Sequence, residues 1–335
     1  MKERIVIAGG TGFLGRLLAG HFNATGYDVV IFTRSPKPVN GAAREVPWDG
    51  RTRGNWVNEL DGARAVINLA GRSVNCRYDA RNRRLIFDSR IESTRVLGEA
   101  MARCPNPPRV WLNASTATIY KHSIEHPWDE SGEIGATREA KDEFSVEIAR
   151  AWEDAFNTAT CPRTRKVLLR LSMVFGVTPG TVFRVLRRLA RAGLGGAMAG
   201  GRQYVSWIHE TDFCRAVEWL INHDEISGPV NIAAPNPLPN REMMNTMRRT
   251  CGAPLGLPAT LWMLEVGAFF LRTETELIIK SRRVVPGRLL AAGFQFQFAD
   301  FASAITDLEA RLGGGRSTPE VPISHEPGTS KTDMR

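Results

Sequence analysis

The sequence is poor in tyrosine and in lysine. Of 335 residues only 4 are tyrosines, and the 44 basic residues are 37 arginines and 7 lysines. Cysteine is also sparse, and its five residues are widely spaced without a Cys-x-x-Cys pair, which argues against both a disulfide framework and a zinc site. We therefore expect no metal site. The five are Cys76, Cys104, Cys161, Cys214 and Cys251.

Long apolar runs are missing as well. The best candidate, Ala259 to Leu271, is shorter than the roughly 20 residues that a membrane span needs, and it contains Glu265. The chain starts Met1-Lys2-Glu3-Arg4 and runs directly into a strand-like segment, without the apolar region of a signal peptide. We therefore expect a cytoplasmic protein with no membrane contact.

Composition and length are those of an ordinary globular protein. With 43% hydrophobic and 24% charged residues, the chain matches neither disordered nor membrane proteins. Its length exceeds the roughly 250–300 residues at which single cores stop growing, which predicts one large domain and a smaller one.

The net charge is +9, and one stretch of the sequence contains basic residues only among its charged ones. Between Arg163 and Arg202 there are nine basic residues and no acidic ones. Four arginines there have the spacing of one helix face, which a solvated surface, an anionic ligand or a nucleic acid would each explain. We favour the solvated face, and expect no nucleic-acid partner because no aromatic residues are interleaved. The four are Arg184, Arg187, Arg188 and Arg191.

Short β-branched runs alternate with longer helical patterns, which predicts an α/β fold with a Rossmann-type doubly wound parallel sheet and a smaller C-terminal substrate-side region. We expect a mainly Rossmann domain over 1–235, with substrate-side elements from about 177, a mainly helical region over 236–312 and a disordered tail over 313–335. The expected strands are Arg4–Ala8, Asp28–Thr33, Arg44–Pro47, Ala65–Leu69, Arg109–Ala114, Lys166–Leu171, Gln203–Ile208 and Val230–Ala233. The expected helices are Phe13–Thr25, Ala80–Arg103, Asp142–Thr158, Val182–Ala192 and Asp212–Asn222, with helical patterns around Arg241–Thr250 and Ala259–Val284.

A glycine-rich turn follows the first expected strand and opens the first expected helix. Such a turn brings the backbone close to a pyrophosphate, and the helix N-terminus offers unpaired N–H groups to it. The second strand ends in Thr33-Arg34-Ser35, where an Asp or Glu would hold the ribose of NAD. A guanidinium beside a hydroxyl suits a 2′-phosphate, so we expect NADP rather than NAD, the alternative being an exposed, unrelated arginine. The turn residues predicted to bind the cofactor are Gly9, Gly10, Thr11, Gly12, Phe13, Leu14 and Gly15.

Together with these features, further strings make roughly residues 1–310 resemble the extended short-chain dehydrogenases/reductases. More narrowly, the chain resembles an atypical, epimerase-like subgroup with a C-terminal block of unassigned function. The strings are Asn68-Leu69-Ala70-Gly71, Ser89-Arg90, Ser93-Thr94-Arg95, Ala114-Ser115-Thr116, Trp152-Glu153, Arg170-Leu171-Ser172, Ser206-Trp207-Ile208-His209, Glu274-Thr275-Glu276-Leu277, Ser281-Arg282-Arg283-Val284-Val285-Pro286 and Gly293-Phe294-Gln295-Phe296.

The sequence lacks one catalytic motif of this superfamily. Active members of the superfamily use Tyr-x-x-x-Lys, in which the tyrosine exchanges a proton with the substrate. None of Tyr27, Tyr78, Tyr120 and Tyr204 has a lysine four residues later. Aligning the helix on Trp152-Glu153 places Ser145 and Ala149 at the two positions, so catalysis does not follow from the fold.

Other parts of the site match the superfamily. The resemblance implies that Thr116 binds the substrate oxygen, with Tyr120 four residues on as a second catalytic candidate. Arg90 is expected to contact the cofactor or an acidic substrate, the alternative being a structural ion pair. His209 is either an acid/base or, as we favour, a capping residue. The remaining cofactor-binding candidates are Leu69, Ala70, Gly71, Ser115 and Ser172.

Two functions remain open. One is an NADP(H)-binding reductase-like or epimerase-like enzyme acting on an unidentified small carbonyl or alcohol. The other is a non-catalytic NADP(H)-binding sensor or regulatory protein. By analogy with the superfamily, the long helices Ala80–Arg103 and Asp142–Thr158 suggest a possible homodimer.

Overall fold

A computed structural model of the chain describes residues 2–37, 43–265 and 274–313. At its centre lies a parallel sheet of seven strands, in the order β3-β2-β1-β4-β5-β6-β10, which confirms the predicted doubly wound α/β fold. The strands are β1 (Arg4–Ala8), β2 (Asp28–Thr33), β3 (Arg44–Pro47), β4 (Ala65–Asn68), β5 (Val110–Thr116), β6 (Arg165–Leu171) and β10 (Gly228–Ile232).

The strand order reverses between β1 and β4. These two strands pair in parallel, with Ile5 opposite Ala65 and Ala8 opposite Asn68. Their residues are almost all buried, as expected for strands that are covered on both faces and therefore read as continuous apolar runs. In such sheets ligands bind in the crevice at the carboxyl ends beside this reversal.

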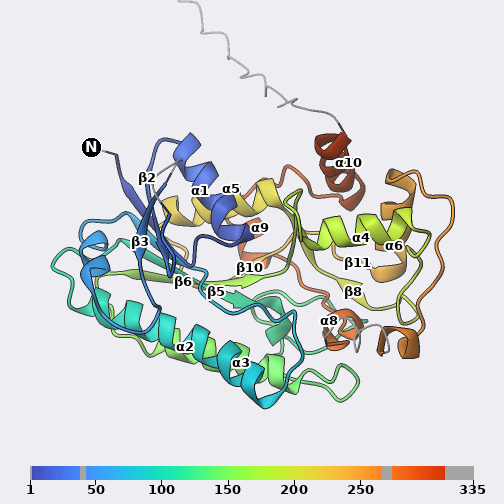
Figure 1. Cartoon of the computed structure of the whole chain (residues 1–335), viewed down its shortest axis with the longest axis horizontal. Helices are drawn as coiled ribbons and strands as arrows, with labels where there is room; N and C mark the ends of the chain where they lie inside the picture. Colours follow the sequence, from blue (N-terminus) through green and yellow to red (C-terminus); the bar gives the residue numbers. More distant parts are fainter. Residues whose placement is uncertain (1, 38–42, 266–273, 314–335) are drawn as a thin grey trace, which may run out of the picture.

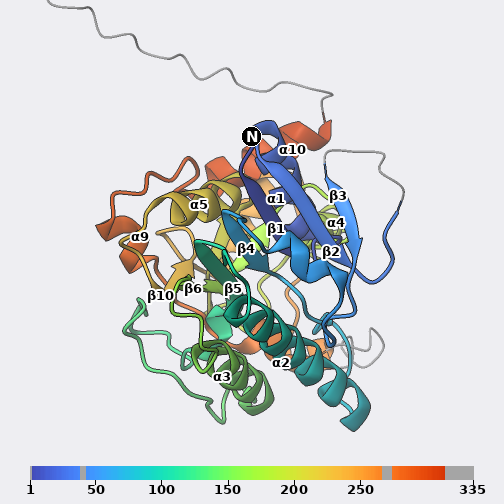
Figure 2. The same ribbon diagram turned by 90° about the vertical axis from the view of Figure 1, so that its left-hand side faces the viewer.

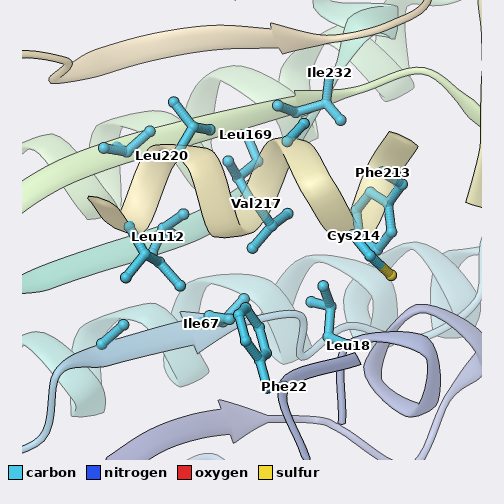
Figure 3. Packing of buried hydrophobic residues seen from close by; sticks show 14 of the residues in the cluster. Leu18, Phe22, Ile67, Leu112, Leu169, Phe213, Cys214, Val217, Leu220 and Ile232 are labelled. Carbon is cyan, nitrogen blue, oxygen red and sulfur yellow. The ribbon is translucent and has the colours of Figure 1, made fainter. Parts of the chain in front are cut away.

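Two layers of helices cover the sheet (Figures 1 and 2). α1 (Phe13–Ala24) and α5 (Glu210–Asn222) lie on one face, and α2 (Ala80–Ala102) and α3 (Glu143–Asn157) lie on the other. Figure 3 shows the core under α1 and α5, where Leu18 and Phe22 of α1 belong to one buried cluster with Phe213 and Val217 of α5 and the strand residue Ile67.

A smaller region extends from the carboxyl end of the sheet. β7 (Met173–Phe175) pairs with β9 (Trp207–His209), and β8 (Tyr204–Val205) pairs with β11 (Leu238–Pro239). Around these strands α4 (Val182–Arg191), α6 (Asn240–Thr250) and α10 (Phe301–Gly313) enclose a second core of aromatic and methionine side chains. The short α9 (Gly287–Ala291) lies against β10.

Two expected elements differ in the structure. The strand expected over Gln203–Ile208 is split at Ser206, whose hydroxyl accepts from the Val284 N–H and donates to the Arg282 carbonyl. The helix expected over Ala259–Val284 is likewise interrupted. Residues 261–265 are helical, 266–273 lie outside the described residues, and α8 covers only Glu276–Ile279.

The chain after α8 is extended because its polar groups bond to distant segments rather than to a helix of their own. The Ser281 hydroxyl donates to the Ser123 carbonyl, and the Arg282 N–H donates to the Tyr204 carbonyl. The last described helix, α10, continues to Gly313, the first residue of the expected tail. Residues 314–335 of that tail lie outside the described residues.

The basic face of α4 is partly occupied by a neighbouring helix. Arg187 and Arg191 lie 2.5 and 3.7 Å from the carboxylate of Glu309 in α10. Two of the four arginines on this face therefore link α4 to α10 through ion pairs. No helix of the described ranges is long and apolar enough to cross a membrane.

Candidate functional site

The glycine-rich turn between β1 and α1 depends on glycine at two positions. Gly9 has φ +73°, and a Cβ there would lie 2.8 Å from the Ala70 Cα. A Cβ on Gly15 would lie 2.4 Å from the Gly10 Cα. The sequence thus lets the turn, the end of β4 and the first turn of α1 approach more closely than side chains allow.

The start of α1 is free to receive an anion. Gly12 is its N-cap and provides no side-chain cap, and the first turn has no acidic residue. A Cβ on Gly12 would meet no atom within 4 Å, so the space in front of the helix is open. Unpaired N–H groups and the helix dipole favour a phosphate at such a position. The residues present therefore fit a dinucleotide pyrophosphate.

Arg34 lies just past the carboxyl end of β2, and its side chain is exposed. Within residues 2–37, 43–265 and 274–313 it forms no ion pair. The neighbouring Thr33 is buried, and its Oγ1 accepts from the Ser35 N–H at 3.4 Å. The guanidinium is therefore available to a phosphate group.

A pocket of about 220 Å³ opens beside the glycine-rich turn. It brings together six of the predicted site residues, namely Leu14, Leu69, Gly71, Arg90, Ser115 and Thr116. Its other lining residues are Val74, Tyr78, Ala114, Thr118, Ser145, Ile148, Trp152 and Leu171. The wall is mainly apolar with a few hydroxyls and one guanidinium, which suits a small ligand with few polar groups.

Thr116 ends β5 and has a hydroxyl that is only half engaged. Its Oγ1 accepts from the Thr118 N–H at 3.1 Å. A threonine hydroxyl also has one hydrogen to donate. Thr116 therefore fits its predicted role as a donor to a substrate oxygen.

Arg90 projects from α2 into the pocket wall. Its Nη1 donates to the carbonyls of Ile86 and Arg72 at 3.0 and 3.1 Å, and its guanidinium lies 5.0 Å from the Trp152 ring centroid. Burial lowers the pKa of Arg90 to about 10. No carboxylate within the described part of the chain forms an ion pair with it. The structure thus offers a half-buried cation that carbonyls, and not a carboxylate, hold in place.

Tyr120 and Ser172 were also predicted site residues, but neither lines the pocket. The Tyr120 hydroxyl is buried, donating to Asn231 Oδ1 and accepting from Arg170 Nη1, both at 2.8 Å. Burial raises the pKa of this phenol to about 12. The Ser172 hydroxyl donates to the Ile232 carbonyl at 2.7 Å and so links β6 to β10. Both hydroxyls are engaged in bonds that hold the fold.

Two residues that line the pocket, and two glutamates that accept hydrogen bonds from them, were not among the predicted site residues. Tyr78 and Ser145 both line the pocket, and the Ser145 hydroxyl donates to the carboxylate of Glu276 in α8. The Tyr78 N–H donates to Glu274 Oε1 at 2.8 Å. Two signals were available: the alignment that places Ser145 at the position of the superfamily tyrosine, and the C-terminal string that contains both glutamates, whose role the resemblance leaves open.

Buried charges fasten this C-terminal segment to the end of β5. Lys280 pairs with Asp142, both almost completely buried, and donates to the Thr118 carbonyl at 2.5 Å. Arg282 Nε donates to Thr118 Oγ1 at 3.2 Å. Figure 1 shows α8 beside the ends of β5 and α3. Since buried charges are stable only when paired, these contacts fix the segment against the pocket.

His209 is a capping residue, as favoured from the sequence. It is fully buried at the N-cap of α5, where Nδ1 accepts from the Thr211 N–H at 3.1 Å. Its Nε2 lies 3.1 Å from Asp307 Oδ2. Burial lowers the pKa of His209 to about 4, although the charge of Asp307 opposes the shift. The imidazole is therefore neutral at physiological pH.

The protonation of His209 predicts an acid-sensitive stability. Between its ordinary pKa of 6.5 and its folded value of about 4, the unfolded chain binds this proton and the folded chain does not. The free energy of unfolding should therefore fall as the pH drops through this window, by up to about 3 kcal/mol. Urea unfolding of the wild type and of His209→Gln at pH 7 and pH 4.5 measures this. An equal pH dependence in both proteins would exclude His209 as its source.

Comparison with known proteins agrees with this geometry. The human epimerase family protein SDR39U1 is 28% identical over 314 residues, covering 92% of this chain and all of the relative. The Bacillus subtilis (strain 168) epimerase family protein YfhF is 29% identical, covering 91% of this chain and 98% of the relative. A crystal structure of human SDR39U1 with NADPH superposes with a TM-score of 0.80 at 26% identity, covering 91% of this chain and 98% of that one.

Two family profiles match successive parts of the sequence. A domain of unknown function, DUF1731, matches residues 260–308, which include α8 and the segment that follows it. The profile described as the NAD dependent epimerase/dehydratase family matches residues 5–233, more than half of the chain and all seven strands of the central sheet but the first residue of β1. The chain therefore belongs to the NAD-dependent epimerase/dehydratase family.

Proposed function

We propose that the chain is a cytoplasmic NADP(H)-binding oxidoreductase that acts on a small carbonyl or alcohol. One observation carries this proposal. Leu14, in the first turn of α1, and Thr116, at the end of β5, line the same pocket. This supports a single site in which the glycine-rich turn binds the cofactor and the Thr116 hydroxyl binds the substrate. By analogy with the superfamily, we propose a homodimer formed through α2 and α3.

The choice of NADP(H) over NAD(H) rests on Arg34. A guanidinium at the end of β2 pairs with a 2′-phosphate, whereas a ribose hydroxyl calls for a carboxylate. The solved human relative was crystallised with NADPH. When bound, the reduced nicotinamide supplies a hydride to the substrate carbon. The Thr116 hydroxyl then donates to the carbonyl oxygen, and Arg90 binds an acidic group of the substrate or the cofactor's phosphate or ribose.

Removal of the Arg34 guanidinium tests the cofactor preference. We expect Arg34→Ala to weaken NADPH binding about 10- to 100-fold, the worth of one or two charge-assisted hydrogen bonds, with NADH binding unchanged. Isothermal titration with both nucleotides measures the difference. Arg249→Ala, at an exposed arginine near the end of α6, is the matched control and should leave both affinities unchanged.

Turnover is tested by mixing the protein with stoichiometric NADPH and a panel of small aldehydes, ketones and oxo acids. Loss of the reduced-nicotinamide absorbance with at least one of them is expected. No loss with any carbonyl would contradict an oxidoreductase.

A second candidate is an NADP(H) sensor without catalysis. Ser145 and Ala149 stand where active relatives have tyrosine and lysine, and this observation favours it. It predicts NADPH binding without turnover, together with a change in oligomeric state on binding. Light scattering with and without NADPH separates the sensor from the enzyme.

A further inference from the structure

We propose that Tyr78 is the proton donor of this site, in place of the superfamily tyrosine that the chain lacks, and that Ser145 and Glu276 position its hydroxyl. This inference rests on the proposed function and names the acid that its reaction requires.

The first support is the position of the phenol. Tyr78 lines the same pocket as Thr116 and Arg90. Its ring packs edge-on against Phe144 at 4.9 Å between centroids, and its N–H is held by Glu274. Phe144 of α3 therefore contacts the ring of Tyr78, and Glu274 of the C-terminal segment holds its backbone.

The second support is that the Tyr78 hydroxyl has no well-formed hydrogen bond among the described residues. Its oxygen is buried, and its contacts with Ser145 and Glu276 fall short of hydrogen-bond geometry. An unsatisfied buried polar group costs about 1–3 kcal/mol, so such groups are uncommon without a functional reason. Tyr120 is the contrasting case, since its buried hydroxyl both donates and accepts a hydrogen bond away from the pocket.

The third support is the pair beside the phenol. Ser145 occupies the aligned position of the missing tyrosine, and its small side chain leaves this part of the wall open to a ring from the loop before α2. Its hydroxyl donates to the buried carboxylate of Glu276. Both residues lie near enough to Tyr78 to shift its pKa.

The electrostatics favour a protonated phenol. Burial, and then the negative charge of Glu276, raise the pKa of Tyr78 well above its usual range. The group is thus protonated at physiological pH and gives its proton to the alkoxide oxygen that carbonyl reduction creates, because that oxygen is the stronger base. Arg90 lies close enough for the charges of the two groups to interact, so its guanidinium stabilises the phenolate left after the transfer.

The step balances as a carbonyl reduction. A bound NADPH would supply the hydride to the substrate carbon and be oxidised to NADP⁺, so that the carbonyl would be reduced. The Tyr78 O–H bond breaks, and its proton forms the new O–H bond on the substrate oxygen. The phenolate then regains a proton from solvent, through the Ser145 hydroxyl, which restores the starting state.

Kinetics with matched tyrosine variants test the proposal. Three proteins are compared: the wild type, Tyr78→Phe and Tyr27→Phe. Each is mixed separately with NADPH and the same mixture of acetaldehyde, methylglyoxal and pyruvate. We expect Tyr78→Phe to lower the single-turnover rate about 10²- to 10⁴-fold, with NADPH affinity within about twofold of wild type. Tyr27→Phe, whose ring packs on Phe22 away from the pocket, should keep the wild-type rate.

Turnover by Tyr78→Phe at the wild-type rate would overturn the proposal and leave the proposed function intact. Absence of turnover in the wild type itself would instead overturn the function, and the proposal with it.

A titration supplies a readout that does not depend on turnover. Because the chain has four tyrosines, the near-ultraviolet tyrosinate spectrum of wild type minus Tyr78→Phe isolates one phenol. We expect Tyr78 to remain un-ionised at the pH where a free tyrosine is half ionised, about 10, and Glu276→Gln to lower its apparent pKa. Ionisation of Tyr78 at the ordinary pH, or no shift in Glu276→Gln, would refute the positioning by Glu276.

Discussion

Glu153→Ala is expected to lower the free energy of unfolding by about 3–5 kcal/mol, because it leaves the Arg170 guanidinium buried without its carboxylate. The two groups are 2.8 Å apart, and their side chains are only 8% and 5% exposed. Glu153 also accepts from the Ser115 hydroxyl at 2.6 Å, so the substitution removes a pocket contact as well. Urea unfolding monitored by tryptophan fluorescence gives the magnitude.

Two variants sharpen this test. Glu147→Ala removes an exposed carboxylate from the same helix, α3, and should change stability by no more than about 0.5 kcal/mol. The double variant Glu153→Met with Arg170→Met replaces both charges and should recover much of the loss. A loss below about 1 kcal/mol in Glu153→Ala would show that water reaches Arg170 and that the pair is not buried.

Gly15→Ala is expected to weaken NADPH binding by at least about tenfold and to destabilise the fold by about 1–3 kcal/mol. The added Cβ would lie 2.4 Å from the Cα and 2.5 Å from the carbonyl of Gly10, so the turn that faces the pyrophosphate must move. Isothermal titration with NADPH and thermal unfolding measure the two effects.

The same helix contains a matched control. A Cβ on Gly20 meets no atom within 4 Å. Gly20→Ala should therefore keep NADPH affinity and raise stability by up to about 1 kcal/mol, since alanine favours the helix. Equal NADPH affinities in the two alanine variants would contradict a cofactor site at the turn.

The central sheet was predictable because its strands are local apolar runs. β1, β2 and β3 have the predicted ends, and the other strands of the sheet differ by at most two residues. The start of α2 was also marked locally, since Asp79 caps it by accepting from the Asn82 N–H. The glycine-rich turn was readable because its strand, glycines and helix are contiguous in the chain.

The pocket was less predictable because its wall is assembled from distant segments. Tyr78 and Glu274 are 196 residues apart and meet through a hydrogen bond that no periodicity reveals. Tyr120 follows the same strand as Thr116, but whether its hydroxyl faces the pocket or Arg170 depends on the turn after β5. The extended segment after α8 is likewise set by tertiary bonds from Ser281 and Arg282, which outweigh its local helical pattern.

A crystal structure of the chain with NADPH would show directly whether the turn, Arg34 and the pocket form one cofactor site. We expect the pyrophosphate at the start of α1, the 2′-phosphate at Arg34, and the nicotinamide in the pocket beside Thr116 and Tyr78. Density for the nucleotide elsewhere, or a nicotinamide outside this pocket, would contradict a single cofactor site.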